Sequence, residues 1–126
     1  YLQTIVVLDG KVIGKGFNKR EAKHDISSHA EIEAIKEAEL YLNNWRLTGA
    51  TLYVTLEPCL MCAGAILQSR ISKVVFGSYD KKDGALVSSY FVYDSPCIHE
   101  RPLVFGGVLL ETCDKLLSDF FASKRN

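Results

Sequence analysis

Two short groups of residues in this chain carry side chains that could do chemistry together. His29 and Glu31 stand two positions apart, and Cys59 and Cys62 form a Cys-x-x-Cys pair directly after Pro58. Pro58 suits the first turn of a helix, and two cysteines at i and i+3 on a helix lie side by side on one face. The helix N-terminus stabilises the thiolate form that a metal ion needs.

His29, Cys59 and Cys62 are the residue types of a zinc site. His29, at the start of an earlier helix, can supply the third ligand beside the two thiolates. Three protein ligands leave the fourth tetrahedral position open for water, which separates a catalytic zinc ion from a closed structural one. The pattern therefore predicts one catalytic zinc ion (Zn2+) per chain.

Glu31 is the residue that we expect to move protons. It lies roughly 200° around the helix axis from His29, but the backbone at a helix start leaves it free to turn toward water on the metal. Zinc lowers the pKa of such water to about 7, and a carboxylate can pass its proton to a leaving amine. Ser28 and Glu31 also have the S-x-x-E spacing of a capping box, and of the two roles we favour the catalytic one.

The cysteine pair has other interpretations. Cys-x-x-Cys alone also occurs in redox pairs and in structural zinc sites. A redox pair gives no reason for the His-x-Glu sequence, and a structural site needs a fourth ligand. Cys97, His99 and Cys113 are candidates for that ligand, although Cys113 falls on the apolar face of an expected helix and fits the core better.

The composition bounds the kind of protein. The 126 residues, 48% hydrophobic and 24% charged, predict a single globular domain over 1–126. No apolar run is long enough to cross a bilayer, and Tyr1-Leu2-Gln3 does not open a signal peptide, so we expect no membrane association. The cysteine usage fits a reducing, cytoplasmic setting.

The formal net charge of zero excludes a global basic field, so nucleic-acid binding would need a local patch. A basic cluster before the site could hold phosphates, or could be only a solvated face. It comprises Lys11, Lys15, Lys19, Arg20 and Lys23.

Strand and helix patterns alternate along the chain, which predicts an α/β sandwich with a mixed sheet. Asp9-Gly10 between two β-rich runs predicts a hairpin, and we expect Trp45 in the core. A helix should start at the N-cap Ser28 and end at Asn43-Asn44, and the run 86–93 fits either a strand or a short helix. Strands are expected over 2–8, 11–17, 51–56, 73–77 and 103–105, and further helices over 58–69 and 109–121.

On these residues the chain resembles the bacterial tRNA-specific adenosine deaminases. His-x-Glu followed by Pro-Cys-x-x-Cys is the signature of zinc deaminases. The likeness covers most of the chain from Lys11 onward and is most specific from Asn44 to Gly77, because cytidine deaminases share the ligands but not the surrounding sequence. The matching runs are Asn44-Trp45-Arg46-Leu47, 51–59, 61–65, 69–71, 74–77 and 116–121.

The resemblance implies a cytidine-deaminase-like three-layer α/β/α sandwich with a mixed five-stranded sheet. It implies a cytoplasmic homodimer that hydrolyses the wobble adenosine of a tRNA anticodon stem-loop to inosine, with zinc-bound hydroxide and Glu31 as proton shuttle. It also implies substrate contacts at Asn18, Ala30 and Asp80, although Asp80 could be an ordinary loop carboxylate.

Three departures from the family are visible. No N-terminal helix precedes the first strand, Tyr1-Leu2-Gln3-Thr4 replaces a Pro-Val-Gly-Ala-like turn, and Ile98-His99-Glu100 replaces Asn-His-Arg. The alternative functions are a deaminase of free nucleosides or bases, such as cytidine or guanine, and a non-catalytic zinc-binding RNA-binding subunit. Glu31 argues against the second, because a silent subunit has no need of that carboxylate.

Overall fold

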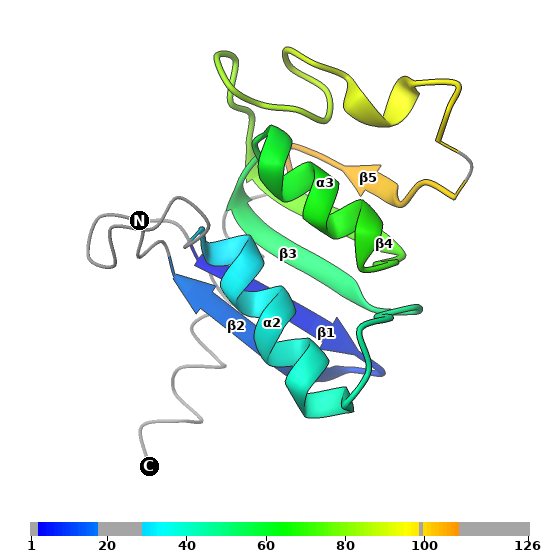
Figure 1. Cartoon of the computed structure of the whole chain (residues 1–126). Helices are drawn as coiled ribbons and strands as arrows, with labels where there is room; N and C mark the ends of the chain where they lie inside the picture. Colours follow the sequence, from blue (N-terminus) through cyan, green and yellow to red (C-terminus); the bar gives the residue numbers. More distant parts are fainter. Residues whose placement is uncertain (1–2, 18–28, 99, 109–126) are drawn as a thin grey trace.

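The computed structural model describes residues 3–17, 29–98 and 100–108 (Figure 1). Five strands form one sheet in the order β2-β1-β3-β4-β5. β1 pairs antiparallel with β2 and β3, whereas β3 with β4 and β4 with β5 are parallel pairs, so the predicted mixed five-stranded sheet is confirmed. The elements are β1 (Gln3–Leu8), β2 (Lys11–Phe17), α2 (Ala30–Leu42), β3 (Thr51–Leu56), α3 (Leu60–Gln68), β4 (Lys73–Ser78), η1 (Val92–Asp94) and β5 (Leu103–Phe105).

The hairpin between β1 and β2 turns at the predicted residues. Asp9 and Gly10 have φ of 52° and 76°, as a two-residue turn that matches strand twist requires. α2 and α3 lie on the same face of the sheet, α2 over β1 and β2 and α3 over β3 and β4 (Figure 1). The fully buried core side chains lie with this sheet and its helices, and include Leu47, Leu52, Ile66, Val74 and Phe76.

α2 packs directly on the backbone of β2 because both surfaces are small. A Cβ on Gly14 would lie 2.2 Å from the carbonyl oxygen of Ala34, and one on Gly16 would lie 2.0 Å from that of Ala30. Ala30, Ala34 and Ala38 repeat at i+4 and are all 0% exposed. This contact fixes the N-terminal end of α2 at the Phe17 end of β2.

Both helices begin later than predicted. α2 starts at Ala30 with the extended residue His29 as N-cap, and the His29 side chain makes no capping hydrogen bond. The prediction of Ser28 as N-cap is therefore wrong, and a contact between Ser28 and Glu31 lies outside the described residues. α3 starts at Leu60 with Cys59 as N-cap, so Pro58 precedes the helix. The two N-caps, His29 and Cys59, are both predicted metal ligands, and their side chains turn toward each other.

Other predictions had different outcomes. α2 ends as expected, because Asn43 adopts the left-handed conformation at the C-cap. Trp45 is 51% exposed and lies beside the Arg46 guanidinium, so its core placement is wrong. The ambiguous run 86–93 forms turns that lead into η1. The C-terminal helix predicted over 109–121 lies outside the described residues, as do Ser28, Asn18 and His99.

Candidate metal centre and active site

His29, Cys59 and Cys62 come together at the starts of α2 and α3. The Nδ1 atom of His29 lies 3.5 Å from Cys59 Sγ and 3.3 Å from Cys62 Sγ. All three ligand atoms lie within 4.8 Å of one another. Tetrahedral bonds to one zinc ion would separate a nitrogen from a sulfur ligand by about 3.5 Å. The group therefore has the donor atoms and the spacing to hold one metal ion.

The pKa values of the Cys59 and Cys62 thiols are shifted in opposite directions. A hydrogen bond with Cys62 lowers the pKa of Cys59 to about 5, against the opposing effect of burial. The same hydrogen bond, together with burial, raises the pKa of Cys62. The thiolate form is therefore favoured at Cys59 and disfavoured at Cys62, and a metal ion bound by both would need both thiols deprotonated.

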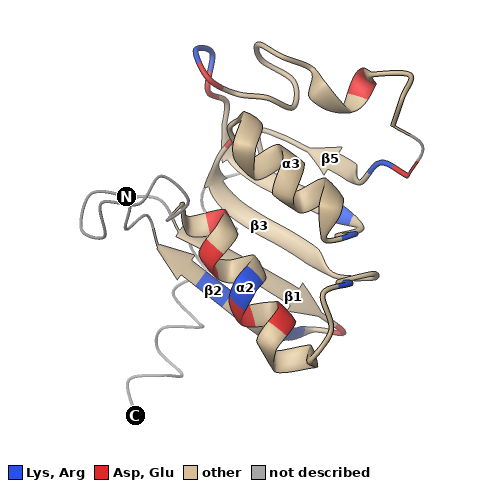
Figure 2. Cartoon of the chain, in the orientation of Figure 1, with Lys and Arg blue, Asp and Glu red and all other residues tan. Residues whose placement is uncertain are grey.

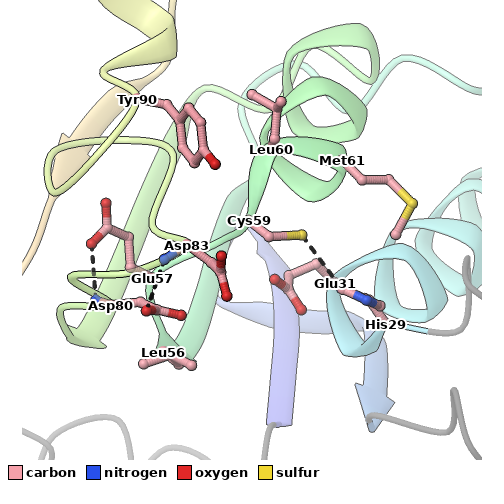
Figure 3. Close-up of a pocket in the computed structure, with 10 residues that line it drawn as sticks. All are labelled: His29, Glu31, Leu56, Glu57, Cys59, Leu60, Met61, Asp80, Asp83 and Tyr90. Carbon is pink, nitrogen blue, oxygen red and sulfur yellow. Dashed lines mark hydrogen bonds between the residues drawn. The ribbon is translucent and has the colours of Figure 1, made fainter.

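Glu31 lies beside this group in the first turn of α2 (Figure 3). The residue is only 4% exposed, and its Oε1 atom has no hydrogen-bond partner among the described residues. Burial raises the pKa of its carboxyl group above the ordinary value. Burying an oxygen without a hydrogen bond costs free energy, so such an atom is a candidate for a functional role. Glu31 therefore brings a buried carboxyl oxygen beside the possible metal ligands, and its role in proton transfer stays a prediction.

The ligand group opens into a cavity of about 480 Å³, within the usual size range of small-molecule sites. One wall comes from the helix starts and the other from the loop after β4, as Figure 3 shows. The lining residues are His29, Glu31, Leu56, Glu57, Cys59, Leu60, Met61, Asp80, Asp83 and Tyr90.

The predicted substrate contacts are placed differently from one another. Asp80 lines the cavity, and its Oδ1 atom accepts hydrogen bonds from the backbone N–H groups of Lys82 and Asp83, both 3.1 Å long. Ala30 is fully buried against Gly16 and is not a lining residue. Its side chain therefore does not reach the cavity, and a contact through its backbone stays a prediction. Asn18 lies outside the described residues.

Sequence reasoning missed several cavity residues, among them Tyr90 and Glu57. Tyr90 stands on the loop opposite Glu31, and only the abundance of aromatic residues in its segment pointed to it (Figure 3). Glu57 is 3% exposed although it is charged. Burial raises the pKa of its carboxyl group, but hydrogen bonds from Ser88 and from backbone N–H groups outweigh this and lower the pKa overall. A carboxylate at the end of a β-rich run was the available signal.

The predicted basic cluster does not gather at the cavity in the described part of the chain. Lys15 forms an ion pair of 3.7 Å with Glu37, and Lys11 lies over the Tyr41 ring near the far end of α2. Figure 2 shows basic residues scattered among acidic ones. Lys19, Arg20 and Lys23 lie outside the described residues. No described helix is long and apolar enough to cross a membrane.

The fold and the site together define a class of protein, a deaminase of cytidine-deaminase-like fold. A family model of the MafB19-like deaminases matches residues 2–122. The tRNA-specific adenosine deaminase of Haemophilus influenzae is 46% identical over 114 residues, which are 90% of this chain and 66% of that protein. The Bacillus subtilis protein of the same name is 44% identical over 121 residues, which are 96% of this chain and 75% of that protein. The chain belongs to the MafB19-like deaminases and to the family of the tRNA-specific adenosine deaminases.

Solved structures agree with this assignment. A structure from a study of A-to-I editing by tRNA:A34 deaminases matches with a TM-score of 0.81 and 42% identity, over 84% of this chain and 82% of that chain. The guanine deaminase of Bacillus subtilis matches with a TM-score of 0.63 and 30% identity, over 99% of this chain and 80% of that chain.

Proposed function

We propose that this protein hydrolyses the wobble adenosine of a tRNA anticodon loop to inosine. One observation carries the proposal: a buried glutamate oxygen, which has no hydrogen-bond partner in the described part of the chain, stands beside a His/Cys/Cys group inside a cavity. Relatives named tRNA-specific adenosine deaminase, at 44–46% identity, support adenosine in tRNA as the substrate. The chain spans 66% of one of these relatives and 75% and 80% of two others, so the activity of the whole protein is part of the proposal.

In the proposed site, His29, Cys59 and Cys62 hold one zinc ion per chain. A zinc ion held there by three protein ligands would act as a Lewis acid and lower the pKa of a bound water molecule to about 7. The spacing of the three ligand atoms and the donor set of one imidazole and two thiols both suit a divalent zinc ion.

Glu31 moves the protons of the reaction. Hydrolysis replaces the amine on C6 of adenine with the oxygen of water and releases ammonia. One proton of the water goes to ring nitrogen N1 and the other to the departing amine, so two protons have to be carried. Glu31 Oε1 is buried and accepts no hydrogen bond from residues 3–17, 29–98 or 100–108, so it can take up and release each proton in turn.

The cavity walls orient the base. Asp80 is held in a fixed orientation by two backbone N–H groups, so its carboxylate can accept a hydrogen bond from the substrate. Tyr90, on the same wall, offers a ring against which a base can stack. Contacts at Asn18 and at the backbone of Ala30 remain part of the proposal.

The proposal further includes a homodimer in the cytoplasm, formed by a single domain over residues 1–126. Leu60 and Met61 leave apolar surface beside the metal group, 51% and 37% exposed, and this surface suits contact with a second copy. Sedimentation equilibrium should give the mass of two chains, and a monomer at all concentrations would remove this part of the proposal.

The substrate is tested by comparing an anticodon stem-loop that carries adenosine at the wobble position with free adenosine, cytidine and guanine. The matched control is the same stem-loop with guanosine at that position. We expect inosine in the adenosine stem-loop alone. Activity confined to free nucleosides or bases would reject the RNA substrate, and would favour the guanine-deaminase-like alternative that the Bacillus subtilis structure represents.

A further inference from the structure

Glu57 is a buried carboxylate for which the proposed reaction has no use. It follows β3, stands two residues before Cys59 and is 3% exposed. Its own backbone N–H donates to the carbonyl oxygen of Ser78 over 2.9 Å, which continues the pairing of β3 with β4. The backbone of Glu57 therefore belongs to the sheet, while its side chain lines the cavity.

Among the residues that the structure describes, all hydrogen bonds to the carboxylate of Glu57 come from the loop that follows β4. Its Oε1 atom accepts from the N–H of Asp80 at 3.1 Å and from the hydroxyl of Ser88. Its Oε2 atom accepts from the N–H groups of Leu86, Val87 and Ser88, at 3.1, 2.8 and 3.1 Å. Hydrogen bonds to a charged acceptor are roughly twice as strong as neutral ones. Four backbone positions of the loop thus depend on one side chain.

The loop also packs tightly against Glu57. A Cβ on Gly84 would lie 2.4 Å from the carboxyl carbon of Glu57 and 2.4 Å from the carbonyl oxygen of Asp80, so only glycine fits there. The N–H of Ala85 donates to the carbonyl oxygen of Pro58 over 2.9 Å. These contacts join the loop to Glu57 and Pro58, which lead directly into Cys59.

The same loop supplies one wall of the cavity. Asp80, Asp83 and Tyr90 line it opposite His29 and Glu31 (Figure 3). Asp83 and Tyr90 are exposed loop residues, so few other contacts hold them in place. Their position relative to the metal ligands therefore follows from how the loop is held.

We propose that Glu57 is a positioning residue that holds the loop 80–90 against the segment carrying Cys59, and so sets the distance between the substrate-binding wall and the metal group. The proposal deepens the proposed function and rests on it for the substrate, but the anchoring of the loop stands without it. In this role Glu57 touches neither the substrate nor the metal. It acts on binding more than on the chemical step.

The test uses Glu57→Gln, with Ser88→Ala as a milder variant and Glu37→Gln as the matched control. Gln keeps the size of the side chain but removes the charge and one acceptor oxygen. Ser88→Ala removes one donor and leaves the four N–H groups in place. Glu37 is an exposed carboxylate on α2, away from the loop, so its substitution loses the same charge without touching the anchor.

Four quantities are measured on each variant: amide hydrogen exchange in the loop, zinc per chain, and kcat and KM on the stem-loop. In Glu57→Gln, exchange at Leu86, Val87 and Ser88 should accelerate on the order of tenfold or more, because a charge-assisted hydrogen bond is lost. KM should rise about tenfold while kcat changes less than about threefold, with zinc unchanged. Ser88→Ala should change amide hydrogen exchange and KM in the same direction as Glu57→Gln but to a smaller extent. Glu37→Gln should match the wild type in all of these measurements.

Loop exchange as slow as in the wild type would overturn the proposal. A fall in kcat and in zinc content at unchanged KM would also overturn the proposal, because it would show that Glu57 supports the metal ligand Cys59 and not the loop 80–90. If Glu57→Gln does not fold, the test rests on Ser88→Ala. Amide hydrogen exchange and KM equal to those of the wild type in Ser88→Ala would contradict the role of Glu57 in holding the loop. If the wild-type protein has no activity on the stem-loop, the proposed function is rejected. Amide hydrogen exchange in the loop would still test whether Glu57 holds the loop 80–90.

Discussion

The closest contact between the sheet and the catalytic helix makes a sharp prediction for Gly16→Ala. A Cβ at this position would lie 2.0 Å from the carbonyl oxygen of Ala30 and 2.8 Å from the backbone nitrogen of Ala34. Both are backbone atoms, so no side chain can rotate away. Because real Cβ atoms essentially never come within 3.0 Å of a heavy atom of a residue that is not a chain neighbour, α2 and β2 have to separate by about 1 Å.

The size of the effect follows from this displacement. Overpacking of a core contact costs about 1–3 kcal/mol, and in a chain of this size each kcal/mol lowers the melting temperature by about 3–5 °C. Ala30 is the first residue of α2, next to His29 and Glu31, so the shift reaches the catalytic groups. A misplacement of about 1 Å can cost about 100-fold in rate. We expect kcat/KM on the stem-loop to fall by that order.

Gly64→Ala is the matched control, because a Cβ there meets nothing within 4 Å. Gly64 lies inside α3, where alanine is favoured over glycine by about 0.5–1 kcal/mol. This variant should melt slightly higher than the wild type and keep its activity. Thermal unfolding and inosine formation on both variants test the reasoning. Gly16→Ala with wild-type melting and turnover would refute the close packing of α2 on β2.

Three further predictions concern the metal, the core and a helix end. His29→Ala should lose bound zinc, measured by plasma mass spectrometry, because one ligand of three is removed; wild-type zinc content would contradict its role. Ile66 is 0% exposed, so Ile66→Ala should cost about 2–5 kcal/mol in urea unfolding, and a cost below about 1 kcal/mol would argue against its burial. Asn43 has φ of 51°, so Asn43→Ala should cost about 1–2 kcal/mol and Asn43→Gly almost nothing; equal stability of the two variants would speak against the left-handed cap.

Local signals in the sequence predicted much of the fold. Asp9-Gly10 marks the hairpin because few residues accept positive φ at both turn positions, and Asn43 marks the end of α2 for the same reason. The strand bounds followed from β-rich runs between such breaks. The grouping of His29 with Cys59 and Cys62 was predicted because their chemistry requires a common partner.

What the sequence did not predict depends on contacts between distant segments. The helix starts were misplaced because His29 and Cys59 are N-caps whose side chains face each other instead of the helix. Trp45 was misplaced because hydrophobic type alone does not tell a core residue from one on a surface connection. The role of Glu57 was missed because its donors come from a loop that follows only after α3 and β4.

The most direct test of the account is to measure zinc content and inosine formation together in Glu31→Gln. Glu31 is not one of the three ligands, so the variant should hold one zinc ion per chain like the wild type. Loss of its proton transfer should lower turnover of the anticodon stem-loop by about 100-fold to 10,000-fold. A variant with bound zinc and turnover near that of the wild type would contradict the account.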